Sequence, residues 1–131
     1  MTRLPALLAA SLLLLSGSAA IAKPKLDPEA RLAKALEGRV AGEPVSCIDL
    51  HRVRSSRVIT DTAIIYDAGG TLYVNRPRAG AESLNQWDAL VTRTPTTRLC
   101  SVDPVQVVNP QSGMMTGVVM LDDFIPYRRT D

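Results

Sequence analysis

The clearest local signal in this chain is AIIYDAGGTLYVN, residues 63–75. Two runs rich in β-branched and aromatic residues flank the pair Gly69-Gly70, an arrangement typical of a β-hairpin with a two-residue primed turn. Side chains alternate along a strand, so we expect Ile64 and Tyr66 on one face and Ile65 on the other. The two glycines are expected to meet the positive-φ requirement of the turn and to serve no ligand.

A short helix is expected before this hairpin. Asp27-Pro28-Glu29 offers an N-cap carboxylate, a proline at the first helical position and an acid in the first turn. Leu32 and Leu36 lie four residues apart and form one apolar stripe, and Gly38 can end the helix in the left-handed conformation. A helix of about eleven residues is marginal alone, so it must dock on another element.

From Pro44 onward the sequence alternates between short β-type runs and turn signals. We predict an α+β domain: an N-terminal helix followed by a mainly antiparallel sheet, or a small barrel, of six to seven short strands. Asp61-Thr62 is expected to form a turn, and residues 81–90 a loop or a single helical turn that leads into a strand. Besides the hairpin, strands are expected over residues 45–50, 57–60, 98–102, 105–108 and 115–121.

The first residues have the layout of a secretory signal peptide. Met1-Thr2-Arg3 is positively charged, Leu4 to Leu15 is almost entirely apolar, and small residues lead to an A-x-A sequence ending at Ala22. The apolar run is too short to span a bilayer comfortably, and no cysteine near the cleavage site could carry a lipid. The sequence therefore predicts a signal peptide over 1–22 and no stable membrane anchor.

The remainder, residues 23–131, has the length of a single domain, which we expect to be periplasmic or extracellular. Residues 23–26 and 128–131 are expected to be disordered. The chain has 15 basic and 13 acidic residues, and removing Arg3 with the leader leaves 14 basic residues. So small an excess of positive charge gives no reason to expect a nucleic-acid partner. The oligomeric state stays open.

Cys47 and Cys100 are the two cysteines, and both lie in the exported part. An even pair in a small exported domain favours a disulfide. Because the bond would close a loop of 53 residues, loop-closure entropy predicts a stabilisation of about 4 kcal/mol. The alternative is a redox-active or nucleophilic thiol, but the chain has no Cys-x-x-Cys spacing and one histidine.

That histidine, His51, follows Cys47 and Asp49 at alternate positions, which on a strand would place all three on one face. Same-face neighbours on a strand are about 6.5–7 Å apart, too far for a direct hydrogen bond between a nucleophile and its base. We therefore predict no catalytic residues. A binding surface is predicted instead at His51, Arg52 and Arg54, with Tyr73 as a nearby aromatic anchor. A solvated outer face is the alternative for the same residues.

No metal or cofactor is expected. The scattered aspartates lack the spacing of a calcium loop, and the methionines lack a histidine for a copper site. The aspartates are Asp61, Asp67, Asp103, Asp122 and Asp123, and the methionines are Met114, Met115 and Met120.

Short motifs across most of the chain after Gly38 resemble a family of small exported proteins of unknown function from Gram-negative bacteria. Many of its members carry further cysteines at places where this chain has Arg78-Ala79-Gly80 and Val118-Val119-Met120, so only a Cys47–Cys100 bridge could be shared with them. The resemblance implies export and a single fold. It implies no particular activity, because the family has none assigned. Its motifs are Val45–Ile48, Arg57–Ile59 with Asp61, Leu72–Asn75, Leu99–Asp103 and Leu121–Tyr127.

We therefore expect a non-enzymatic periplasmic or secreted domain that binds a protein or another envelope component. One alternative is a small secreted protease inhibitor, in which Arg93 to Cys100 would present an arginine on an exposed loop. Another is a hydrolase with a site assembled around His51 and distant acids.

Overall fold

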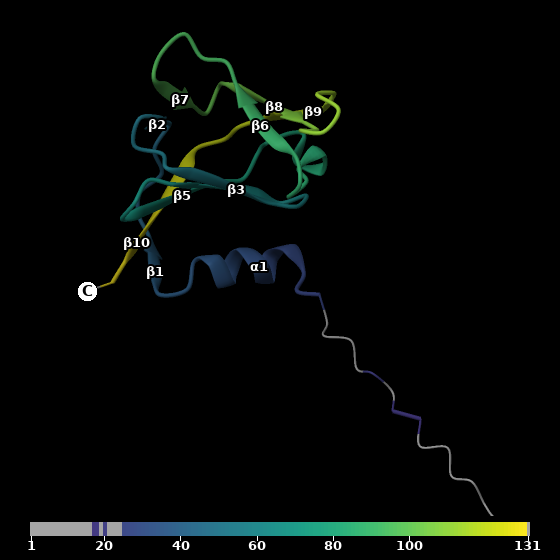
Figure 1. Cartoon of the computed structure of the whole chain (residues 1–131). Coiled ribbons are helices and arrows are strands. Elements are labelled where there is room, and N and C mark those ends of the chain that lie inside the picture. The colour runs from purple at the N-terminus through teal and green to yellow at the C-terminus, as the bar shows by residue number, and fades with distance from the viewer. Residues whose placement is uncertain (1–16, 19, 21–24, 131) are drawn as a thin grey trace, which may run out of the picture.

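The computed structural model describes residues 25–130, together with Gly17, Ser18 and Ala20. The predicted signal peptide otherwise lies outside the described residues. In the described part, one α-helix comes first and ten strands follow, with a short 3₁₀ helix among them (Figure 1). The elements are α1 (Pro28–Ala35), β1 (Arg39–Ala41), β2 (Cys47–Asp49), β3 (Ser55–Ile59), β4 (Ala63–Asp67), β5 (Thr71–Asn75), η1 (Ala81–Ser83), β6 (Ala89–Thr92), β7 (Arg98–Cys100), β8 (Pro104–Val108), β9 (Met115–Met120) and β10 (Phe124–Arg129).

The strands form three antiparallel sheets. The largest has five strands in the order β1-β10-β5-β4-β3, a second has the order β6-β8-β9, and β2 pairs with β7. This arrangement confirms the β-rich α+β class and the antiparallel pairing. The predicted number of six to seven strands is wrong, because the described residues form ten.

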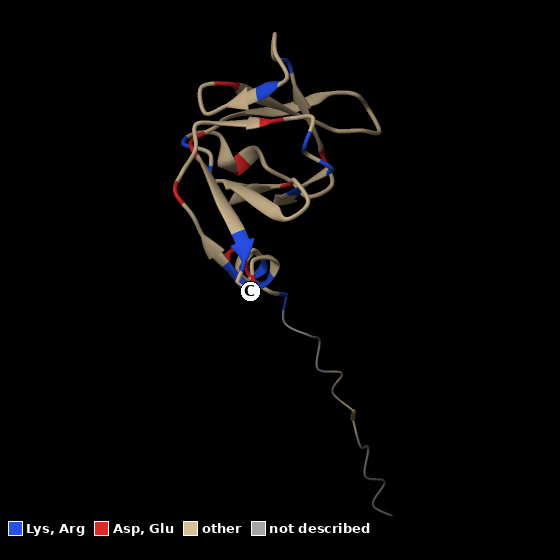
Figure 2. Ribbon diagram, turned by 90° about the vertical axis from the view of Figure 1, so that its left-hand side faces the viewer, with Lys and Arg blue, Asp and Glu red and all other residues tan. Residues whose placement is uncertain are grey.

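β1 and β10 account for part of that error. β1 has three residues and is held by its antiparallel pairing with β10 rather than by any local signal. β10 contains Pro126, which lacks a donor and normally argues against a central strand, yet β10 lies between β1 and β5. Arg128 and Arg129, expected to be disordered, belong to β10 and pair with β1. This basic end of β10 lies beside α1 (Figure 2).

The predicted hairpin is present, with β4 and β5 in antiparallel register. The Ala68 N–H donates to the Thr71 carbonyl at 2.9 Å, and the Gly69 N–H donates to Asp67 Oδ1 at 2.8 Å. Of the two glycines, only Gly69 has a positive φ, +82°. A positive φ at the first central position alone is the pattern of a type II′ turn. The turn therefore depends on one glycine rather than on the pair.

β4 is buried on both faces, so it borders two hydrophobic cores. Ile64 and Tyr66 belong to the first core, beneath the β6-β8-β9 sheet, whereas Ile65 belongs to the second core with Leu32 of α1. This division confirms the predicted alternation. The helix and the three-stranded sheet accordingly lie on opposite sides of the five-stranded sheet (Figure 1).

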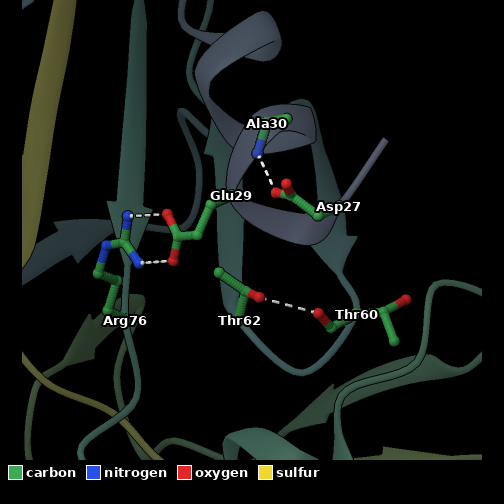
Figure 3. Close-up of polar contacts among 6 residues, drawn as sticks. All are labelled: Asp27, Glu29, Ala30, Thr60, Thr62 and Arg76. Carbon is green, nitrogen blue, oxygen red and sulfur yellow. Dashed lines mark hydrogen bonds and ion pairs between the residues drawn. The ribbon is translucent and has the colours of Figure 1, made fainter. Parts of the chain in front are cut away.

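α1 begins as its sequence predicts. Asp27 is the N-cap, and its Oδ1 accepts a hydrogen bond from the Ala30 N–H at 2.8 Å (Figure 3). The helix ends at Ala35, earlier than expected, and Gly38 follows with a φ of +72°. Leu32 is the buried residue that docks the helix.

The predicted disulfide joins Cys47 of β2 to Cys100 of β7, with an S–S distance of 2.06 Å. The two cysteines are direct partners in the antiparallel register. Hydrogen bonds from the Ser101 N–H to the Ser46 carbonyl and from the Leu50 N–H to the Thr97 carbonyl flank the bond. The disulfide thus fastens the smallest sheet across 53 residues of sequence.

We expect Gly69→Ala to lower the free energy of unfolding by about 1–2 kcal/mol, because a Cβ is disfavoured at positive φ. Gly70→Ala is the matched control, since Gly70 lacks a positive φ and no atom lies within 4 Å of the position a Cβ would take. It should change stability by less than about 0.5 kcal/mol. Urea denaturation measures both. Equal losses in the two variants would contradict the turn assignment.

We expect the double variant Cys47→Ala/Cys100→Ala to lose about 2–4 kcal/mol of unfolding free energy, because the unfolded chain regains the entropy of an open loop. The wild-type protein unfolded in the presence of a reductant is the control and should show a similar loss. An unfolding midpoint equal to that of the oxidised wild type would show that the bond does not stabilise the fold.

Candidate functional site

The disulfide-side hollow, of about 410 Å³, contains two of the four predicted binding residues, Arg52 and Tyr73. It also contains Arg98, the first residue of β7, and Asp49, the last residue of β2. The remaining lining residues are Cys47, Ile48 and Thr97. Two arginines beside one carboxylate give this hollow a small excess of positive charge.

The other two predicted binding residues lie elsewhere. β2 ends at Asp49, and His51 lies in an exposed turn beyond the strand. Arg54 precedes β3 and lies beside the hairpin, where its guanidinium carbon is 3.5 Å from the position a Cβ would take at Gly69. His51 and Arg54 do not line the disulfide-side hollow.

The geometry around His51 also bears on the hydrolase alternative. Cys47 is held in the disulfide and offers no thiolate. Asp49 Oδ1 accepts a hydrogen bond from the backbone N–H of His51 at 2.9 Å. That carboxylate therefore caps its own turn, while the cysteine of the alternating trio is unavailable as a nucleophile. In the segment of the inhibitor alternative, Arg93 to Cys100, residues 93–97 connect β6 to β7 and the last three residues form β7.

A second concave region adjoins α1, and we call it the Trp87 groove. It consists of three hollows, of about 610, 550 and 390 Å³, which share Arg31. Its walls come mainly from α1, from β3, from the segment that joins η1 to β6 and from the start of β6. The lining residues are Lys25, Leu26, Pro28, Arg31, Lys34, Ala35, Ser56, Arg57, Val58, Ile59, Thr60, Asn85, Gln86, Trp87, Asp88, Ala89 and Leu90.

Trp87 is the most exposed large apolar side chain of the described part, at 76%. Its loop is held in place from both sides. Leu84 is buried in the first core, and its carbonyl accepts a hydrogen bond from the Asp61 N–H. The Trp87 N–H donates to Asn85 Oδ1 at 3.0 Å, and Gln86 Oε1 accepts from the Arg31 guanidinium. A fixed loop therefore presents an indole that the core does not use.

The charges of the Trp87 groove are mostly positive. Lys25, Arg31, Lys34 and Arg57 line it, against one carboxylate, Asp88. Asp88 Oδ2 already accepts a hydrogen bond from the Thr116 hydroxyl at 2.9 Å. The groove therefore combines an exposed aromatic with guanidinium and ammonium groups.

A two-point ion pair connects α1 to the residue that follows β5. Arg76, directly after β5, donates from its two terminal nitrogens to the two Glu29 oxygens at 2.7 and 2.9 Å (Figure 3). The hydrogen bonds from Arg76 lower the pKa of the Glu29 carboxyl, and the same bonds raise the pKa of Arg76. Both side chains are more than half exposed, and an exposed pair of this kind contributes little to stability.

The Trp87 groove was not expected from the sequence. β3 carries Arg57 to a position beside α1, away from the disulfide-side hollow that Arg52 lines. The sequence predicts a loop or a single helical turn over residues 81–90, the segment that contains Leu84 and Trp87. The available signal was Asn85, a residue that starts tight turns and here breaks the helical spacing between those two residues.

Among the described residues, Tyr66 also has a shifted pKa. It lies in the first core, with its ring edge-on to Phe124 at a centroid distance of 5.8 Å. Burial raises the pKa of its phenol, and the described residues offer its hydroxyl no hydrogen-bond partner. It lines neither concave region, so we assign it to the core.

Within the described residues, no group of three or more His, Cys, Asp or Glu side chains is placed to hold a metal ion. The one α-helix of that part is far from the length and hydropathy that a bilayer crossing requires. No protein-family model, curated protein or solved structure matches the chain. The chemistry of the two concave regions therefore follows from their own residues.

We expect the pKa of Glu29, followed by NMR, to lie below the ordinary value of about 4.3 and to return to it in Arg76→Gln. A carboxyl whose pKa is lower folded than unfolded stabilises the fold above its unfolded-state pKa. That contribution is lost as the pH falls through the lower, folded-state value. Arg93→Gln, an exposed arginine in the loop after β6, is the control and should leave the Glu29 titration unchanged. If Arg76→Gln also leaves it unchanged, the ion pair does not form in solution.

Proposed function

We propose that this chain is an exported, non-catalytic domain that binds a partner protein of the cell envelope through the Trp87 groove. The observation that carries the proposal is the exposed indole of Trp87, set in a groove between Arg31 and Arg57. Tryptophan and arginine are the residues most often found at the energetic centres of protein interfaces. The hollows also fall in the size range of ligand-binding clefts.

Export is supported by the sequence and by the disulfide. The charged start, apolar run and A-x-A sequence of residues 1–22 are typical of a signal peptide. The Cys47–Cys100 bond suits an oxidising compartment, where such bonds persist.

The non-catalytic part of the proposal is supported by how the candidate groups are used. The cysteines are bonded to each other, and the Asp49 carboxylate caps its own turn beside His51. Nucleophilic catalysis needs a nucleophile within hydrogen-bond reach of a base. Cys47 and His51, the pair that the sequence offered for this role, do not supply it.

The experiment is site-specific photocrosslinking in cells of the native host. A photoreactive phenylalanine analogue replaces Trp87 in one variant and Val102 in another, because Val102 is 70% exposed and does not line the groove. Position 87 should give a discrete adduct with one protein, identified by mass spectrometry, and position 102 should not. The adduct should also weaken when Arg31→Glu is added to the variant at position 87.

A third variant carries the analogue at Arg52, in the disulfide-side hollow. A discrete adduct from position 52 and none from position 87 would move the binding surface to that hollow and overturn the proposal. The same adducts from positions 87 and 102 would show unspecific proximity, which also overturns it.

A further inference from the structure

We infer that the Trp87 groove receives an extended, acidic segment of the partner, which pairs with β3 as an added strand of the five-stranded sheet. This inference rests on the proposed function and adds the type of segment and its mode of attachment. It is carried by the uncovered edge of β3 and by the different chemistry on the two sides of that edge.

β3 is an edge strand. It ends the sheet order β1-β10-β5-β4-β3, so among the described strands it pairs with β4 alone. Ser55, Ser56 and Arg57 are exposed along it. An edge strand leaves backbone N–H and C=O groups unpaired on one side, and an extended peptide can pair with them. At five residues, β3 is long enough to form several such bonds.

The hollow beside this edge lies between two sheets. Ser56, Arg57 and Val58 of β3 line it on one side, and Ala89 and Leu90 of β6 line it on the other. β6 is itself the edge of the three-stranded sheet. The hollow therefore runs between two strand edges, with Trp87 in its wall, and an extended chain fits this shape better than a helix does.

The side facing α1 is basic. Arg57 shares a strand face with Ile59, which packs in the second core beneath α1. Arg57 accordingly lines one hollow together with Arg31 and Lys34 of the helix. An added strand on β3 would point every second side chain toward these three cations, which favours carboxylates at those positions.

The side facing β6 adds apolar residues to the polar groups Ser56, Gln86 and Asp88 that also line this hollow. Val58 faces the first core, and Ala89 and Leu90 lie across the hollow from it. The remaining side chains of an added strand would meet these residues. Because the two sides alternate along a strand, the groove selects a segment in which acidic and apolar residues alternate.

The test uses the exported protein purified from expressing cells and a capped peptide of alternating glutamate and valine, of about eight residues. Trp87 is the one tryptophan of the chain, so its fluorescence reports directly on the groove. We expect a saturable change in emission at low salt. A peptide of alternating lysine and valine should bind about tenfold more weakly or not at all.

Backbone pairing is tested with two further peptides of the same sequence, one N-methylated at every valine and one at every glutamate. A strand uses the N–H groups of alternate residues to pair with one neighbour, so at least one methylated peptide should lose binding. If both bind like the parent peptide, strand pairing is overturned, because their charges and side chains are unchanged.

Charge recognition is tested in the protein with Arg57→Glu and, as the matched control, Arg93→Glu. Both arginines are exposed, but Arg93 follows β6 and does not line the groove. Arg57→Glu should weaken binding of the glutamate–valine peptide about tenfold, because the substitution removes an ion pair and adds a like-charge contact. Equal effects of the two substitutions would overturn the placement of the acidic side chains.

The crosslinking and peptide experiments together distinguish a failure of this inference from a failure of the proposed function. A Trp87-dependent crosslink in cells together with no response to any of these peptides would overturn the added strand and leave partner binding in place. A crosslink that is absent at position 87 overturns the proposed function itself. A saturable response to the glutamate–valine peptide, weaker for the lysine–valine peptide and for at least one methylated peptide, supports the inference.

Discussion

The arrangement of the fold depends on burial of β4 on both faces. A strand with one wet face needs a single covering layer, whereas Ile64 and Ile65, on opposite faces, each need one. α1 covers the face of Ile65, and the three-stranded sheet covers the face of Ile64. Burial of each aliphatic side chain contributes about 1.5–3 kcal/mol to the free energy of folding. Because β4 has such side chains on both faces, it stabilises the packing of both layers.

The disulfide stabilises the two-stranded β2–β7 sheet, which does not pair with β4. β2 and β7 have three residues each and form a two-stranded sheet, which is marginal by itself in water. Ile48 and Leu99 are buried in the first core, but between them they give the small sheet little apolar surface. A covalent bond between directly paired residues limits the separation of the two strands and brings their buried side chains to the core together.

Features that depend on neighbouring residues could be predicted from the sequence, and pairings between distant segments could not. The Gly-Gly hairpin and the Asp27 N-cap depend on neighbouring residues, and both are present. β1 exists through its pairing with β10, almost ninety residues later, which no local pattern indicates. The same holds for the candidate sites. The sequence predicted that Arg52 and Tyr73 lie near each other, and they line one hollow. Trp87 and Arg57 come together only because α1, β3 and the loop after η1 converge, which no local pattern indicates.

The open edge of β3 is a consequence of the same two-layer arrangement. α1 and the three-stranded sheet cover the faces of the five-stranded sheet, and neither supplies a strand to its edge. Such an edge invites pairing between copies of the chain, and a charged residue on it opposes that pairing. Two copies joined antiparallel at β3 would bring their Arg57 side chains close together on the face where Arg31 already adds positive charge. The arginine that disfavours self-association is thus the one that favours an acidic segment, so a single charge excludes one class of strand and admits another.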